Sequence, residues 1–236
     1  SPIKRLLRHF SDHSLTFSGD AMLILAYQYF EKYEPKVFRD LAKLFSKTAI
    51  EVCEGQQWDV DFENREDVTI AEYLKMIEYK TAVLVAAAMK MGAIIAETSE
   101  ENCSLIYDFG LNLGLAFQLQ DDYLDAFGDP ETFGKQVGGD IIENKKTYLY
   151  LKAQEFANAE QAEELKHLFS IHTEDNSEKI NSVKQIFNAT GASEVTQKAI
   201  QEFTLKAFDT LQKINIDNEK KDILKSFGEN LMGRKV

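Results

Sequence analysis

The scarcity of residues that break helices is the strongest constraint on how this chain can fold. Only three prolines (Pro2, Pro35 and Pro130) and 12 glycines occur in its 236 residues. A long chain with so few turn-forming residues favours long helices over many short strands. The length is ample for a substantial core, and no repeat, low-complexity segment or shift in composition divides the chain. We therefore predict an all-α fold in which residues 1–236 form a single helical domain.

Apolar residues recur at helical spacing through most of the chain. They predict helices over residues 37–53, 70–96 and 103–127, and another from about 140 through the tyrosine-rich segment near 150. Thr69 followed by Glu72 forms the capping-box pattern that marks the start of the second of these helices. The segment from Gly19 is apolar on most faces, which is typical of a helix buried inside a bundle.

Charge and composition limit the classes of function. The 39 acidic and 27 basic residues give a net charge of −12, which argues against a broad nucleic-acid-binding face. The longest apolar stretch contains Lys90 and Gly92 and is shorter than the roughly 18 apolar residues of a membrane span. The basic N-terminus has no apolar core of the kind that a secretory signal needs. Two cysteines, Cys53 and Cys103, show no paired motif. We expect a cytoplasmic protein that does not span a membrane.

An acidic stripe lies near the end of the helix predicted over residues 103–127. Asp121, Asp122 and Asp125 lie within five consecutive positions. Gln118 shares their face, because residues three and four apart are neighbours on a helix. The helix macrodipole disfavours acids at a C-terminus, and carboxylates at this density repel one another unless a divalent cation lies between them. We predict a metal site formed by these three aspartates.

Lysines surround this stripe in the sequence. Lys135, Lys145 and Lys146 follow it, and Lys80 with Thr81 lies mid-way along the helix predicted over residues 70–96. A cation-loaded carboxylate cluster faced by lysines is suited to hold phosphate oxygens. The pattern predicts magnesium-dependent chemistry on a phosphorylated substrate. For Lys80, the residues alone also allow a lysine that extends from a partly buried helix to solvent.

Small residues are concentrated on the two helices that carry these groups. Ala82 and Ala86 follow Lys80, and Gly110 and Gly114 precede the acidic stripe. They let helices approach closely or leave room for a ligand tail, and we expect packing to be the role of the two glycines.

Several segments resemble the trans-polyprenyl diphosphate synthases, which include the farnesyl and geranylgeranyl diphosphate synthases. FQLQDDYLD and GDPETFGKQVGGDIIENKKT resemble the family's second aspartate-rich motif and its lysine-bearing continuation. YKTAVL resembles the family's Lys-Thr segment, and SGDAML resembles its Gly-Asp helix start. The resemblance covers residues 18 to about 150. It implies an isoprenoid-synthase-type bundle of long helices around a central cavity.

The resemblance also implies a role for each matching residue. Asp121 and Asp125 would bind Mg²⁺ that bridges the diphosphate of the allylic substrate, and Asp122 would join through water or as a neighbour. The residues implied to contact the substrate are Lys80 and Lys135 at the diphosphate oxygens, Thr81 and Gln118 near the bond that ionises, and Lys145 beside the motif.

The implied reaction is a head-to-tail condensation. An allylic diphosphate ionises to an allylic cation, isopentenyl diphosphate attacks it, and loss of a proton leaves the chain one isoprene unit longer. The family also implies a homodimer.

One expected part of the family pattern is absent. The family ordinarily carries a first aspartate-rich motif, DDxxD, in its N-terminal half, but Asp20 stands alone and the segment 59–63 follows the helix to which it would need to belong. We therefore expect the bundle to lack its N-terminal helices, which supply half of the metal site. The favoured explanation is an incomplete form of an ordinary synthase, because the aspartates and lysines are retained. The alternative is a non-catalytic partner subunit of a heteromeric prenyltransferase.

Two other classes use a similar helical framework. A terpene cyclase would use the same diphosphate ionisation, but Lys135 and the turn before it favour chain elongation. A helical-bundle metalloprotein with two irons needs two ExxH motifs, and the chain has one, from Glu164 to His167.

Overall fold

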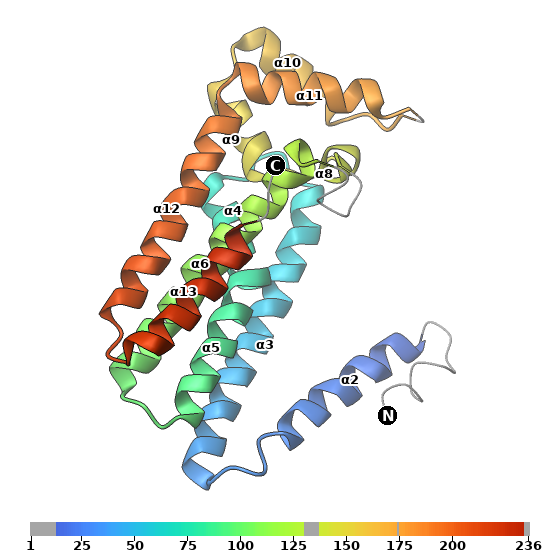
Figure 1. The fold of residues 1–236 in the computed structure, drawn as a ribbon. Coiled ribbons are helices and arrows are strands. Elements are labelled where there is room, and N and C mark those ends of the chain that lie inside the picture. The colour runs from blue at the N-terminus through green and yellow to red at the C-terminus, as the bar shows by residue number, and fades with distance from the viewer. Residues whose placement is uncertain (1–12, 130–136, 174, 234–236) are drawn as a thin grey trace.

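The computed structural model describes residues 13–129, 137–173 and 175–233, with the backbone alone for residues 13–16. All regular structure in these ranges is helical, which confirms the all-α prediction. Four long segments lie side by side in the bundle (Figure 1): α3 (Pro35–Glu63), α5 (Val83–Ile95), α6 (Glu100–Phe127) and α12 (Ala192–Lys213). Helix α6 is central, since it packs on both α5 and α12.

Eight other helical elements, of 4 to 16 residues, lie within the described ranges. They are α2 (His13–Gln28), α4 (Ile70–Ile77), the π-helical turn η1 (Glu78–Ala82), α8 (Gly139–Ile142), α9 (Tyr148–Phe156), α10 (Ala159–Leu168), α11 (Ser177–Ala189) and α13 (Asn218–Met232). Helices α10 and α11 lie across one end of the bundle, and α13 runs along α6 (Figure 1). The larger core cluster surrounds Tyr73, Leu119 and Phe187, and a smaller one surrounds Phe109 and Leu211.

The start of α4 follows the local sequence signal. The Thr69 side chain accepts a hydrogen bond from the Glu72 backbone N–H at 3.2 Å, and the Glu72 carboxylate accepts one from the Thr69 backbone N–H at 2.9 Å. Both halves of the predicted capping box are therefore present. The helix predicted over residues 70–96 is one helical path, but the turn η1 divides it into α4 and α5.

Close packing of α5 on α6 depends on small residues. A Cβ at Gly114 would lie 2.6 Å from the Ala82 Cα, and one at Gly110 would lie 2.8 Å from the Ala86 Cα. Ala82 and Ala86 are fully buried. The packing role expected for both glycines is confirmed, and the space beside Ala82 and Ala86 is filled by α6.

Helix α3 is longer than the sequence predicted. Pro35 occupies its first turn, but the helix runs past Cys53 to Glu63. Gly55 is the reason, because it is a contact glycine and not a helix end. It is buried against the backbone of η1, where a Cβ would lie 2.7 Å from the Tyr79 carbonyl carbon. The prediction that residues 59–63 follow the helix is therefore wrong: they form its last turn.

The helix predicted from about residue 140 is interrupted. Helix α8 ends at Ile142 and α9 begins at Tyr148. Asn144 has a φ of 57°, a left-handed conformation that ends a helix and that asparagine adopts more readily than most residues. As a result, Lys145 and Lys146 lie on a non-helical connection beside the end of α6.

Helix α2 is exposed, contrary to the buried helix that its composition predicted. It projects away from the bundle (Figure 1), and its Phe17 and Ile24 side chains are each more than 60% exposed. Near its C-terminal end, Tyr27 packs edge-on against the Phe45 ring and hydrogen-bonds to Ser46 of α3. Within the described residues, neither α2 nor any other helix is long and apolar enough to cross a bilayer.

Candidate active site

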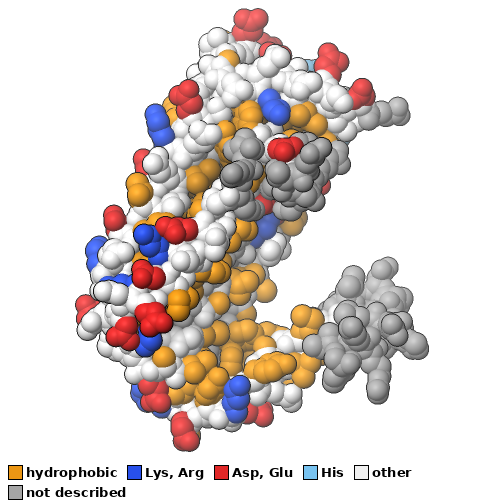
Figure 2. All heavy atoms as spheres, viewed as in Figure 1, with side chains coloured by type: hydrophobic (Ala, Val, Ile, Leu, Met, Phe, Trp, Pro, Cys, Tyr) orange, Lys and Arg blue, Asp and Glu red, His pale blue; other side chains and the backbone are white. Residues whose placement is uncertain are grey.

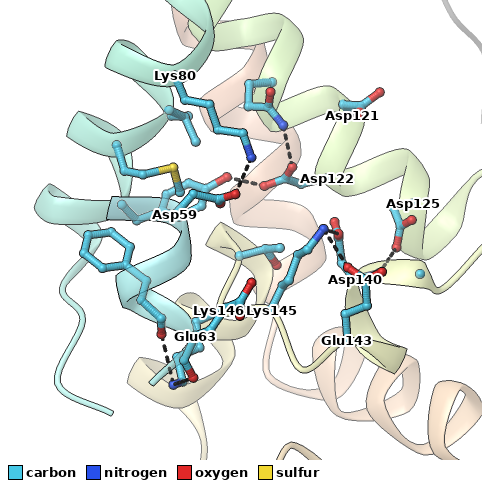
Figure 3. Close-up of a pocket in the computed structure, with 17 residues that line it drawn as sticks. Asp59, Glu63, Lys80, Asp121, Asp122, Asp125, Asp140, Glu143, Lys145 and Lys146 are labelled. Atoms are coloured by element: carbon cyan, nitrogen blue, oxygen red, sulfur yellow. Dashed lines mark hydrogen bonds and ion pairs between the residues drawn. The ribbon is translucent and has the colours of Figure 1, made fainter. Parts of the chain in front are cut away.

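A cavity of about 430 Å³ opens at the end of the bundle where α3 and α6 terminate. Ten of its 17 lining residues are charged and are labelled in Figure 3: Asp59, Glu63, Lys80, Asp121, Asp122, Asp125, Asp140, Glu143, Lys145 and Lys146. Gln118 completes the polar wall, and Tyr73, Met76 and Ile77 form an apolar part of the lining. The structure thus brings together every sequence-predicted site residue except Thr81, which is one hydrogen bond away, and Lys135, which is outside the described residues.

Asp121 and Asp125 are half-buried on the last turns of α6, and Figure 3 shows both beside the cavity. The Asp140 backbone N–H donates to Asp125 Oδ2 at 2.9 Å. Burial, followed by the charge of Asp140, raises the pKa of Asp125 to about 6. The backbone N–H groups and the nearby Lys145 ammonium lower this pKa, but they do not offset burial and the charge of Asp140.

Asp122 is the most enclosed carboxylate in the cavity. Its Oδ2 accepts a hydrogen bond from the Tyr73 hydroxyl, and its Oδ1 accepts one from Gln118 Nε2 at 2.9 Å. Burial, followed by the charge of Asp140, raises the pKa of Asp122 to about 7. Both oxygens of Asp122 therefore accept from side chains, whereas Asp125 accepts from the backbone N–H of Asp140.

Lys80 and Thr81 reach the site from η1. The Lys80 ammonium pairs with Asp59 at 2.5 Å and is 28% exposed. The Thr81 hydroxyl donates to Gln118 Oε1 at 2.9 Å. Single π-helical turns occur frequently at functional sites, and this one carries two adjacent residues that contact different walls of the same cavity.

Four carboxylates of the cavity were not predicted as site residues. Asp59 and Glu63 come from the unexpected last turns of α3. Asp140 and Glu143 follow Gly138, whose φ of 87° permits the tight turn into α8. The Lys145 ammonium lies 3.1 Å from Asp140 and 2.9 Å from Glu143. Burial lowers the pKa of Lys145, but these two carboxylates outweigh burial and raise it. Only the charge pattern of the continuation around Lys145 pointed to Asp140 in advance.

The donor set fits a hard divalent cation. All the candidate ligands are carboxylate oxygens, which suit Mg²⁺ and Ca²⁺ better than soft metals. Within the described ranges, however, no three acidic, histidine or cysteine side chains converge into a complete metal shell. Asp121 and Asp125 are the half-buried carboxylates of α6 at this cavity that could hold magnesium. Glu164 and His167, the single ExxH, are exposed on α10 far along the chain from the cavity.

Titration of these carboxylates leads to a prediction about pH. Because the pKa values of Asp122 and Asp125 are raised in the folded state, their contribution to stability is present near pH 4 and is lost as pH rises through about 6 and about 7. Mg²⁺ competes with protons for the ionised form. We expect saturating Mg²⁺ to raise the melting temperature more at pH 8 than at pH 5.5, measured by differential scanning calorimetry. An equal shift at both values would contradict this.

The adjacent lysines 145 and 146 have different surroundings. The Lys146 ammonium donates to the carbonyl oxygens of Phe62 and Glu63, each at 3.3 Å, and to that of Arg65. These bonds use all three of its N–H groups and cap the C-terminal end of α3. Burial lowers the pKa of Lys146. Lys146 is therefore a structural cap, whereas Lys145 faces carboxylates at the cavity.

This division predicts losses of stability of different size for two neighbouring substitutions. Lys146→Met should lower the free energy of unfolding by about 2 kcal/mol, since bonds from a charged donor to three carbonyl oxygens, two of them part-buried, are lost. Lys145→Met should lower it by less than about 1 kcal/mol, as expected for partly exposed ion pairs. Urea unfolding followed by circular dichroism measures both. Equal losses would show that the cap does not stabilise α3.

Comparisons with known proteins place this geometry in a known class. A solved geranylgeranyl pyrophosphate synthase superimposes with a TM-score of 0.90 at 54% identity, over 96% of this chain and 70% of that one. A geranylgeranyl pyrophosphate synthase from Corynebacterium glutamicum, solved with isoprenyl diphosphate and magnesium, superimposes with a TM-score of 0.82 at 26% identity, over 95% of this chain and 62% of that one. The fold is therefore the isoprenoid-synthase-type helical bundle.

The family follows from the sequence match. The polyprenyl synthetase family model matches residues 6–189, and the chain belongs to that family. A geranylfarnesyl diphosphate synthase from Natronomonas pharaonis is 41% identical over 150 residues, which are 63% of this chain and 44% of that relative. The chain thus spans about half the length of the curated relatives that it matches.

Proposed function

We propose that the chain is the catalytic part of a polyprenyl diphosphate synthase, a prenyltransferase that condenses isopentenyl diphosphate with an allylic diphosphate head to tail. The observation that carries this proposal is the cavity in which Lys80 and Lys145 share one space with Asp121 and Asp125. Membership of the polyprenyl synthetase family supports the choice of diphosphate substrates.

The residues that line the cavity suggest what each group contributes to the reaction. Lys80 and Lys145 hold the diphosphate oxygens of the allylic substrate, and Asp121 and Asp125 hold magnesium. When bound, magnesium supplies positive charge that neutralises the leaving diphosphate. The allylic C–O bond breaks with its electron pair on the diphosphate, so preorganised cations lower the barrier by stabilising the charge that develops there. Met76 and Ile77 give the lining an apolar part that excludes water from the carbocation.

The direct test is magnesium-dependent incorporation of radiolabelled isopentenyl diphosphate into extractable product, with geranyl and farnesyl diphosphates as allylic substrates. The assay uses this chain and, in parallel, the longest gene product that contains it. Incorporation that is abolished by EDTA and restored by Mg²⁺ supports the proposal. Absence of incorporation by both forms contradicts it.

We further propose that the protein is a cytoplasmic homodimer in which a second copy covers the exposed face of α2 and the adjoining bundle. Figure 2 shows hydrophobic side chains gathered along this hollow face. The exposed large hydrophobic side chains of α2 are Phe17, Met22, Leu23 and Ile24, and those of α3 and α5 include Ile50 and Leu84. An apolar patch of this kind on a charged protein marks an interaction site, and the family resemblance favours a second copy as its occupant.

Dimerisation predicts a selective effect on mass in solution. Ile24→Asp places a charge on the apolar face of α2 and should convert a dimer to monomer in size-exclusion chromatography with light scattering. Ile223→Asp is the control, because Ile223 has a similar exposure, 64% against 63%, but lies on α13. A monomeric parent protein, or dissociation by both substitutions alike, would rule out this surface.

A further inference from the structure

The Tyr73 hydroxyl is a buried polar group that the proposed reaction does not use. Tyr73 lies on α4, is 2% exposed, and donates its hydroxyl proton to Asp122 Oδ2 across to α6. Burial and the charge of Asp122 raise the pKa of this hydroxyl, and the nearby Tyr148 backbone N–H at the start of α9 lowers it by less. The hydroxyl therefore keeps its proton, which it donates to Asp122.

Asp122 connects the Tyr73 hydroxyl to Gln118, which lines the cavity. Its second oxygen, Oδ1, accepts from Gln118 Nε2 at 2.9 Å, and Gln118 Oε1 accepts from the Thr81 hydroxyl at 2.9 Å. A chain of hydrogen bonds joins Tyr73, Asp122, Gln118 and Thr81, and so links α4, α6 and η1. The donors on both sides point toward Asp122. Each hydrogen bond fixes the orientation of the neighbouring side chain, so a change at Tyr73 reaches Thr81 through Asp122 and Gln118.

The direction of the chain distinguishes Asp122 from its neighbours. Asp122 is 8% exposed and both of its oxygens accept side-chain donors, whereas Asp121 and Asp125 are half-buried. An amide such as Gln118 has two chemically different ends, and a carboxylate held in place keeps the NH₂ end toward itself. The carbonyl end then stays on the Thr81 hydroxyl, beside Lys80.

We infer that Tyr73 and Asp122 are positioning residues, which act through Gln118 to hold Thr81 at the diphosphate side of the cavity. In this assignment Asp122 anchors the chain of hydrogen bonds and leaves metal binding to Asp121 and Asp125. The inference rests on the proposed function for its substrate, but the chain of hydrogen bonds exists independently of turnover.

Tyr73→Phe is the test, because it removes one hydroxyl and keeps the ring. Tyr123→Phe is a matched control: Tyr123 follows Asp122 on α6, is also buried (8% exposed, against 2% for Tyr73), and accepts from Gln197 Nε2 at 2.5 Å. Both substitutions remove one buried, hydrogen-bonded tyrosine hydroxyl. The first measurement is the affinity for inorganic pyrophosphate with saturating Mg²⁺, by isothermal titration calorimetry.

The expected result is a loss of affinity of about tenfold for Tyr73→Phe, which corresponds to one hydrogen bond, and a change below about twofold for Tyr123→Phe. A second measurement is independent of ligand binding. NMR of ¹⁵N-labelled glutamine side chains, with Gln118 assigned by Gln118→Met, should show that the Gln118 amide loses its protection from exchange in Tyr73→Phe alone.

Each outcome decides the inference. Weaker pyrophosphate binding together with loss of Gln118 protection in Tyr73→Phe alone supports it. Equal effects of the two substitutions, or an unchanged Gln118 signal, overturn it. If the parent protein does not bind pyrophosphate, the proposed function fails, and the Gln118 signal alone then decides whether Tyr73 positions this side chain.

Discussion

Lys80→Met is expected to lower kcat/KM for isopentenyl diphosphate incorporation by about 10²- to 10³-fold, the loss typical of removing one preorganised donor from a developing anion. The substitution keeps most of the length of the side chain and removes its charge. It leaves Asp59, which pairs with Lys80 at 2.5 Å, without a cation at the wall of the cavity. Substrate then meets one fewer positive charge and one uncompensated negative charge.

Lys75→Met provides the matched control for this measurement. Lys75 lies on α4 shortly before η1, is 46% exposed, and pairs with Glu78 at 2.7 Å outside the cavity. Its substitution should leave kcat/KM within about twofold of the parent value, as expected for a surface change. Similar losses for both lysines would mean that general charge, and not the position of Lys80, governs the rate.

Gly55→Ala is expected to lower the free energy of unfolding by about 1–3 kcal/mol, the usual cost of overpacking a filled interior. The added methyl group would collide with backbone atoms of Tyr79 and Lys80, which cannot rotate away as a flexible side chain could. Helix α3 would have to move away from η1, so the distance between Asp59 and Lys80 should increase as well. Urea unfolding measures the first effect, and the drop in pyrophosphate affinity reports the second.

Gly92→Ala should act in the opposite direction. Gly92 is exposed within α5, and a Cβ at this position would meet no atom within 4 Å. Alanine there reduces the flexibility of the unfolded chain and should stabilise the protein by about 0.5–1 kcal/mol. A destabilised Gly92→Ala, or a Gly55→Ala protein as stable as its parent, would refute the distinction between the two glycines.

These two glycines also show which parts of the fold were readable from the sequence. Local signals held: the capping box at Thr69 and Glu72 formed, and Pro35 opened α3. Gly55 could not be interpreted locally, because a glycine within a helical pattern can end the helix or permit a close crossing. The second role depends on η1, which lies more than 20 residues further along the chain.

The site residues on α6 could be predicted from the sequence, but the carboxylates that pair with the two lysines could not. Asp121, Asp125 and Gln118 share one face of one helix, so their proximity follows from helical geometry alone. The partners of Lys80 and Lys145, namely Asp59 and Asp140, come from other elements and required the tertiary fold. Exposure of α2 was equally hidden, since an apolar helix carries no information about which surface covers it.

The π-helical turn η1 changes which sequence positions face α6 between the α4 part and the α5 part of one helical path. An α-helix turns by about 100° per residue, and a π-helical turn accommodates about one extra residue without breaking the path. Tyr73 of α4 therefore faces Asp122, while Ala82 at the end of the turn and Ala86 beyond it face the glycines of α6. A chain with one residue fewer in η1 could retain both packed faces, but Lys80 and Thr81 would then no longer share a widened turn. The extra residue is thus an insertion that the packing of the bundle accommodates and that widens the turn carrying Lys80 and Thr81.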